Sequence, residues 1–216
     1  MLKAENIEVY GWEGAVRGAR NPMNSWDRMD SWQSDFTQDG KEGYVIGIND
    51  YKMLKGLCIA GKDHRKWMRM INVTMDITAP LYWWKEFDTY KVGTVANSCS
   101  TMHKIHAKEF TLNDFSHEHL NFDSIEMLEL VLIGLNSYRE EYLETKDKNY
   151  WWQLIQMLPS SYNQKRTVQL NYEVLNTIYH ARKNHKLDEW HTLCDVIKEL
   201  PYSEFITMDF KEGLNE

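Results

Sequence analysis

The sequence lacks the features that mark secreted, membrane-spanning and fibrous proteins. Its first residues, Met1–Asn6, do not show a basic segment followed by an apolar one, so no signal peptide is expected. No apolar run approaches the roughly 20 residues that a membrane-spanning helix needs. Four prolines and 11 glycines in 216 residues exclude collagen-like and low-complexity chains. We therefore expect a globular protein with no membrane partner.

Cysteine is also scarce. Cys58, Cys99 and Cys194 are an odd number, lie far apart and form no CxxC pair. This excludes a disulfide framework or a thiolate zinc site and is typical of reduced thiols in a cytoplasmic protein. Cys99 lies among lysines that would activate a thiolate nucleophile, but a lone cysteine is more often inert.

A third absence is that of any basic block. Lys and Arg number 25 against 32 Asp and Glu, which gives a net charge of −7, so no nucleic-acid partner is expected. The GxGxxG, P-loop and HExxH motifs are missing. His103 with His106, and His117 with His119, have spacings compatible with metal ligands, but these pairs are weak signals and no metal is expected. Nine tryptophans indicate an aromatic pocket or interface, or simply a well-filled core.

Hydrophobic periodicity predicts a strand early in the chain and helices later. Residues 1–45 read as loop-rich because glycines punctuate them. Residues 69–78 alternate apolar and polar, as a half-buried strand does, and Ala79-Pro80 ends that strand and opens a helix. The helices are predicted at 49–61, 81–89, 123 onward, 150–158, 167–184 and 187–200, with a looser stretch at 91–121. The fold class is therefore α+β, a single domain over residues 1–216 with a small sheet packed with long helices.

Asn171 and Arg182 are the first candidate site residues. They lie eleven residues apart, which on a helix over 167–184 closes almost three turns and puts both on one face. An apolar stripe ending in an amide and a guanidinium suits a planar ligand with polar edges, because arginine offers a fixed fork of donors. The alternative is an ordinary ion pair between Arg182 and a carboxylate near the end of the helix.

The segment from Lys91 to Lys104 is a second candidate. It combines Gly93, several hydroxyls and two lysines, the residue types with which a loop binds an anion through backbone N–H groups and hydroxyl donors. An ordinary polar loop has the same composition, and both readings remain open.

Taken in chain order, these segments resemble the flavin-dependent thymidylate synthases. Residues 16–20, V-R-G-A-R, are similar to that family's V-R-A-A-R segment. The family's G-H-E-x-P-type loop, strand and A-P then correspond to Gly61 with His64, the 69–78 strand and Ala79-Pro80. The signature R-H-R-x-x-S-x-N-E-x-S-x-R resembles residues 89–102, with one extra residue before Asn97. Leu158-Pro159, Asn171 and Arg182 keep the family's later spacing, so the resemblance spans about residues 9–190.

The resemblance implies a homotetramer that binds FAD and a pyrimidine nucleotide, deoxyuridylate. The family transfers a methylene from methylenetetrahydrofolate to the pyrimidine and reduces it with flavin hydride, which NADPH regenerates. Arg182 would be the catalytic residue and would stabilise negative charge on the pyrimidine. The residues implied to hold the flavin are His64, Asn171, Tyr90, Lys91 and Asn97. Those implied to hold the nucleotide are Glu86, Ser98, Ser100 and Lys104, with Lys91 or Lys104 beside the phosphate.

The sequence also departs from the family pattern. Thr89 and Tyr90 replace the first two members of R-H-R, and Met102 stands where an arginine holds the nucleotide phosphate. Glu173 replaces an arginine, and Ser98 replaces an acidic residue. Arginine binds phosphate through two parallel hydrogen bonds, which these side chains cannot reproduce. Two alternatives therefore stay open: a non-catalytic flavin- or nucleotide-binding or interaction protein on the same fold, or a flavoenzyme that modifies a different pyrimidine.

Overall fold

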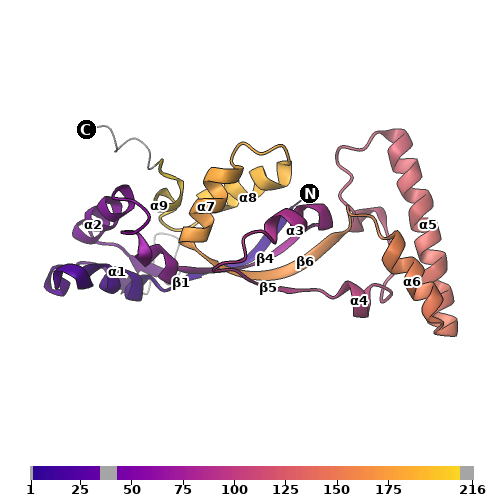
Figure 1. The fold of residues 1–216 in the computed structure, drawn as a ribbon, viewed down its shortest axis with the longest axis horizontal. Helices are drawn as coiled ribbons and strands as arrows, with labels where there is room; N and C mark the ends of the chain where they lie inside the picture. The colour runs from indigo at the N-terminus through magenta and orange to yellow at the C-terminus, as the bar shows by residue number, and fades with distance from the viewer. Residues whose placement is uncertain (1, 35–42, 210–216) are drawn as a thin grey trace. The chain divides into compact units, whose positions relative to one another are not determined.

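A computed structural model gives the structure of the protein and describes residues 2–34 and 43–209 (Figure 1). The strands are β1 (Lys3–Tyr10), β2 (Trp32–Ser34), β3 (Gly43–Val45), β4 (Asn72–Pro80), β5 (Val95–Ser98) and β6 (Asn163–Asn171). The α-helices are α1 (Trp12–Arg20), α2 (Ile48–Ile59), α3 (Leu81–Phe87), α4 (Thr101–Lys104), α5 (Phe122–Thr145), α6 (Lys148–Met157), α7 (Tyr172–Arg182), α8 (Asp188–Lys198) and α9 (Glu204–Thr207). Short 3-10 helices are η1 (Asn21–Met23), η2 (Trp26–Arg28), η3 (Lys66–Met70) and η4 (Leu112–Asp114).

Two sheets are present in the described residues. Four strands form the larger one, in the order β1-β4-β6-β5, and β2 pairs with β3 in antiparallel register, with Trp32 opposite Val45. The predicted α+β class is therefore confirmed. The prediction that residues 1–216 make up a single domain stays a prediction.

Strand β4 shows the alternation that the sequence predicts. Its buried residues Val73, Met75 and Ile77 alternate with half-buried polar ones, because successive side chains of a strand point to opposite faces. The strand continues through Pro80, which then serves as the N-cap of α3. The predicted helices after residues 49, 80, 123, 150 and 187 are all present.

The prediction that residues 1–45 are loop-rich is wrong, because β1 and α1 occupy Lys3–Arg20. Gly14 and Gly18, read as turn signals, lie within α1. A Cβ at Gly18 would lie 3.3 Å from Met70 Sδ, and one at Gly14 would lie 3.7 Å from Met70 Cε. These glycines therefore allow close packing inside a helix rather than breaking it. Residues 35–42 of this stretch lie outside the described residues.

The predicted helix over 167–184 is wrong in its first part. Residues Asn163–Asn171 form strand β6, and the helix begins only at Tyr172. Val168 and Leu170 are buried while Thr167 and Gln169 are exposed, which is the alternation of a strand lying between β4 and β5. The short apolar pattern of these residues fits both the helical period and the strand period. The pairing of these residues in the sheet shows that they form a strand.

The stretch 91–121, predicted as loose, contains β5 and the short α4. All four residues of β5 are exposed, so no hydrophobic alternation in the sequence indicates this edge strand. Ser100 caps α4, since its hydroxyl oxygen accepts a hydrogen bond from the backbone N–H of His103 at 3.1 Å.

The chain divides into two compact units. The hairpin unit comprises Met1–Glu5, Asp76–Thr89 and Ala96–Val168, and the Arg182 unit comprises Asn6–Met75, Tyr90–Val95 and Gln169–Glu216. Within the hairpin unit α5 and α6 pack along each other (Figure 1), with Leu128, Leu132 and Leu135 of α5 in one apolar cluster with Leu154 of α6. Within the Arg182 unit α7 packs against η3, α8 and α9.

Candidate functional site

The guanidinium of Arg182 is held by two aromatic residues of its own unit. Its Nε atom donates a hydrogen bond of 2.9 Å to the phenolic oxygen of Tyr90. Its central carbon lies 4.7 Å from the centre of the Trp190 ring, the range of a cation–π contact. Trp190 is fully buried in α8, so the ring on which the guanidinium rests is packed into the core. Arg182 is thus placed by a hydrogen bond along its edge and a ring against its face.

Arg182 is the last residue of helix α7, and local interactions at both ends of the helix set its limits. Asn171 starts the helix, since its Oδ1 accepts a hydrogen bond of 3.0 Å from the backbone N–H of Val174. Glu173 lies in the first turn and Arg182 in the last, so both charges complement the helix dipole. The prediction that Asn171 and Arg182 share a helix face needs correction, because Asn171 precedes the helix as its N-cap.

The loop before β5 lies against the start of α7. Gly93 has a φ of +77°, and a Cβ there would lie 3.0 Å from Asn171 Nδ2 and 3.2 Å from Val174 Cγ2. Only glycine combines that backbone conformation with so close an approach. The structure therefore brings two predicted segments together: the loop that contains Lys91 and the N-cap residue Asn171.

The same loop holds a polar atom that has no partner within the described chain. The hydroxyl oxygen of Thr94 is buried and makes no hydrogen bond. Such an atom costs free energy unless a ligand or water satisfies it. In the same loop, Lys91 is exposed to solvent. The loop thus contains a buried hydroxyl without a partner among the described residues and an exposed ammonium group, and its Gly93 lies close to the amide of Asn171.

His64 is exposed and lies in the turn that follows α2, where its backbone N–H donates to Gly61 O at 3.0 Å. The next residue, Arg65, makes an ion pair with Glu173, with 2.9 Å between Nε and Oε2. This pair ties the His64 turn to the first turn of α7. Glu173, noted in the sequence only as a lost arginine, therefore has a structural partner.

The remaining predicted residues belong to the hairpin unit. Asn97 and Ser98 are exposed on β5, Ser100 caps α4, and Lys104 is exposed at the end of that helix. Glu86 is half-buried in the last turn of α3. In this unit the segment 96–104 is anchored by Cys99, whose backbone N–H donates to Lys165 O at 2.9 Å and whose carbonyl accepts from Gln164 Nε2 at 2.8 Å.

Two of the three thiols are unsuited to nucleophilic chemistry. Burial raises the pKa of Cys58 to about 12 and that of Cys194 to about 11, so both stay protonated near neutral pH. Cys99 is exposed, and its inertness stays a prediction. Among residues 2–34 and 43–209, no group of three or more His, Cys, Asp and Glu side chains is arranged to hold a metal ion.

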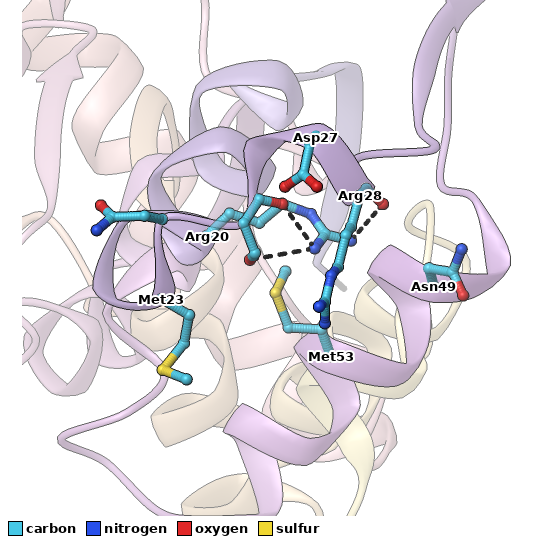
Figure 2. A pocket seen from close by; sticks show the side chains of 8 residues that line it. Arg20, Met23, Asp27, Arg28, Asn49 and Met53 are labelled. Atoms are coloured by element: carbon cyan, nitrogen blue, oxygen red, sulfur yellow. Dashed lines mark hydrogen bonds between the residues drawn. The ribbon is translucent and has the colours of Figure 1, made fainter.

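A pocket of about 730 Å³ lies within the Arg182 unit, and none of the predicted site residues lines it (Figure 2). Its wall includes Arg20, whose guanidinium donates to Asp50 Oδ1 at 2.6 Å and to the Arg28 carbonyl at 2.9 Å. Arg20 is only 4% exposed, so its charge holds the 21–30 segment rather than facing the opening. Asp27, Arg28 and Asn49 also line the pocket.

Sequence reasoning missed three contributors to the site. Trp190 carried no positional signal, because a tryptophan in an amphipathic helix looks like core. Thr94 and Arg65 gave no signal of their own, since only the packing of other segments determines whether a hydroxyl is buried or an arginine paired.

No protein-family model matches the chain, and none of the curated proteins matches it either. Solved structures do match. A crystal structure of thymidylate synthase X (ThyX) from Helicobacter pylori with FAD and dUMP is 15% identical, with full coverage of both chains and a TM-score of 0.66. A second, of flavin-dependent thymidylate synthase ThyX from Helicobacter pylori complexed with FAD and dUMP, is 14% identical. It covers 95% of this chain and 98% of that one, with a TM-score of 0.65.

The chain thus has the fold of the flavin-dependent thymidylate synthases over its whole length, as the sequence resemblance predicts. The particular fold is that of the thymidylate synthase X structures, at an identity that marks a divergent chain. Within the part of the chain that the structure describes, no helix has the length and apolarity to span a membrane.

Proposed function

We propose that the protein is a divergent flavin-dependent thymidylate synthase-like enzyme that binds FAD and a pyrimidine nucleotide. The observation that carries the proposal is the fixed guanidinium of Arg182, held by Tyr90 and Trp190 on the fold that the two solved structures share. A planar donor group whose position is set before a ligand arrives is what stabilises charge that develops on that ligand.

The residues of the Arg182 unit fit the polar edge of a flavin. Asn171 offers an amide, Thr94 a buried hydroxyl without a partner among the described residues, and Lys91 an ammonium group. His64 and Tyr90 of the same unit and, by the family resemblance, Asn97 of the hairpin unit complete the proposed flavin-binding set. When bound, FAD would supply hydride to the pyrimidine after a methylene has come from methylenetetrahydrofolate, and NADPH would restore it.

The chain's own residues would orient the reactants and place charge. Arg182 would stabilise negative charge on the pyrimidine ring, and its rigid mounting keeps the cost of reorganisation low. Ser100 and Lys104 would bind the nucleotide phosphate, one through its hydroxyl and the other through its charge. Glu86 and Ser98 complete the proposed nucleotide-binding set.

The proposed assembly is a homotetramer, and the hairpin unit supports it. Phe122, Met127, Leu130 and Ile133 of α5 are all more than 60% exposed. They form a stripe on the helix side that does not pack into the cluster of Leu128, Leu132 and Leu135. Exposed apolar side chains gathered on one helix side are typical of a subunit interface.

Two rival functions remain open, and the surroundings of Met102 and Glu173 are the reason to test them. Met102 is 50% exposed where an arginine would bind phosphate, and Glu173 is engaged with Arg65. A non-catalytic flavin- or nucleotide-binding protein explains both changes, as does a flavoenzyme that acts on a pyrimidine other than deoxyuridylate.

The deciding experiment is a turnover assay on the purified protein with deoxyuridylate, methylenetetrahydrofolate and NADPH. Formation of thymidylate that is lost in Arg182→Ala supports the proposal. Bound FAD without turnover supports the non-catalytic rival. Turnover with another pyrimidine nucleotide only supports the changed substrate. A protein that binds neither FAD nor any uridine nucleotide contradicts the proposal.

A further inference from the structure

A buried ion pair joins two segments of the Arg182 unit that lie far apart in the sequence. Arg65 Nε lies 2.9 Å from Glu173 Oε2, the distance of an ion pair, and Arg65 Nη2 donates one hydrogen bond of 3.3 Å to Glu173 Oε1. The side chains are 11% and 8% exposed. A charge-assisted hydrogen bond together with a second close contact between the two charged groups holds the guanidinium against the carboxylate.

The positions of Arg65 and Glu173 show which two segments the ion pair connects. Arg65 directly follows His64 and is the N-cap of η3, which packs against α7. Glu173 lies in the first turn of α7, two residues after its N-cap Asn171. The ion pair therefore spans the two segments that carry His64 and Asn171, without using either side chain.

The pair is also costly to break from one side. A buried charge that loses its partner keeps its desolvation penalty, so removing one member destabilises more than the intact pair stabilises. Glu173 has a second favourable contact, because a carboxylate in the first turn of a helix faces the positive end of the helix dipole. The helix dipole therefore helps to fix the position of the Glu173 carboxylate, and the ion pair places the Arg65 guanidinium beside it.

The signs of the charges at positions 65 and 173 are the reverse of those in the family pattern that the sequence resembles. The G-H-E-x-P pattern has an acidic residue directly after its histidine, where this chain has Arg65. Position 173, which resembles an arginine position, holds Glu173 instead. Both signs have changed, and the two changed residues are in contact.

We propose that Arg65 and Glu173 are positioning residues that hold the His64 turn against the N-terminus of α7. Their pair sets the separation between His64 and Asn171. The consequence for cofactor affinity rests on the proposed function, because it requires that these two side chains bind FAD. The mechanical part, a turn held to a helix start by one ion pair, does not.

Amide hydrogen exchange on the full-length protein tests the mechanical part. Two hydrogen-bonded amides report on it: His64 N–H, bonded to Gly61 O, and Val174 N–H, bonded to Asn171 Oδ1. In Arg65→Gln and Glu173→Gln we expect exchange at both amides to rise about tenfold or more, while amides of α8 change less. Arg69→Gln, which removes an exposed arginine from the same 3-10 helix, is the matched control and should leave both amides unchanged.

The charge-exchanged double variant, Arg65→Glu with Glu173→Arg, provides the rescue. It should bring exchange at His64 and Val174 back towards the wild-type rate, although the reversed charge at the helix start makes the recovery incomplete. Arg65→Lys, which keeps the charge but not the fork, should fall between wild type and Arg65→Gln. This milder variant carries the test if a glutamine variant fails to fold.

FAD affinity measured on the same variants separates the two proposals. We expect affinity to fall about tenfold in each single variant and to recover in the double variant. If the wild type binds no FAD, the proposed function fails, and hydrogen exchange still decides on the ion pair. Unchanged exchange at His64 and Val174 in both single variants overturns the inference. So does a uniform rise across the unit without recovery in the double variant, since that describes a loss of general stability.

Discussion

Arg182 Nε donates a hydrogen bond of 2.9 Å to the hydroxyl of Tyr90, a residue 92 positions earlier in the chain. Tyr90 occupies a triplet in which the family resemblance expects a histidine, so sequence comparison alone counts it as a loss. The structure gives it a specific task, because its hydroxyl fixes the edge of the guanidinium whose face rests on Trp190. A departure from a motif is thus compatible with a working site.

Removing that hydroxyl should weaken nucleotide binding while the fold survives. Tyr90→Phe keeps the ring and deletes one hydrogen bond to a charged group, worth about 1.5–3 kcal/mol, so we expect nucleotide affinity to fall about tenfold or more. Titration calorimetry with deoxyuridylate on the FAD-loaded protein measures it.

Tyr179→Phe is the control for Tyr90→Phe, because Tyr179 lies on α7 with its ring facing Lys183 rather than Arg182. It should leave nucleotide affinity unchanged. Equal affinities for wild type and Tyr90→Phe would show that the hydroxyl does not position Arg182 for the ligand.

A methyl group at Gly93 should disturb the loop before β5. Gly93→Ala introduces a Cβ at positive φ and 3.0 Å from Asn171 Nδ2, so we expect a loss of about 1–3 kcal/mol in the free energy of unfolding. Chemical denaturation followed by circular dichroism measures it.

Gly56→Ala is the matched glycine substitution. Gly56 lies within α2, and a Cβ there would meet no atom within 4 Å. It should stabilise the protein by about 0.5–1 kcal/mol, because alanine favours a helix over glycine. Equal effects at the two positions would mean that the approach of Gly93 to Asn171 does not constrain the loop.

Much of the fold could be predicted because some segments carry a single clear period. The alternation of Val73, Met75 and Ile77 identified β4, and the apolar spacing of Leu128, Leu132 and Leu135 identified α5. By contrast, β6 and β5 escaped prediction. The first has a short pattern that also fits a helix, and the second is an exposed edge strand without an apolar face.

For the candidate site, the sequence predicted residue types, and the structure corrects part of their geometry. Asn171 and Arg182 stay predicted site residues, and Asn171 is the N-cap of α7 and not a member of the helix face. Contacts such as Arg182 with Trp190 or Arg65 with Glu173 depend on how segments pack, which no local pattern encodes. The family resemblance predicted the order of the segments along the chain. Packing determines which residues of these segments contact each other.

Acid should destabilise the hairpin unit through His106. Burial, followed by the charges of Lys146, Lys104 and Arg139, lowers the pKa of this histidine from its ordinary value of 6.5. The folded state then binds fewer protons than the unfolded state near that pH, so stability is full above the unfolded pKa and falls as the pH drops towards the folded one.

The melting temperature should therefore decrease between about pH 7 and about pH 5, and His106→Gln should decrease less over the same interval. His119→Gln, at an exposed histidine, is the control and should follow the wild type. A pH dependence that is identical in wild type and His106→Gln would assign the effect to other groups.

A charge on the exposed stripe of α5 should break the proposed homotetramer. Wild type should scatter light as a particle of about four times the 25.7 kDa chain mass, and Leu130→Glu as a smaller one, because a buried unpaired carboxylate is costly in an apolar interface. Gln156→Glu adds the same charge at an exposed position of α6 and serves as the comparison. A wild-type chain that is monomeric at all concentrations would contradict the proposed assembly.

The most direct measurement of the central claim is the visible absorbance spectrum of the purified protein, with mass identification of any cofactor released from it. The account predicts a flavin spectrum and the mass of FAD, either as purified or after addition of FAD, with weaker binding in Arg65→Gln. A colourless protein that takes up no added FAD would contradict it.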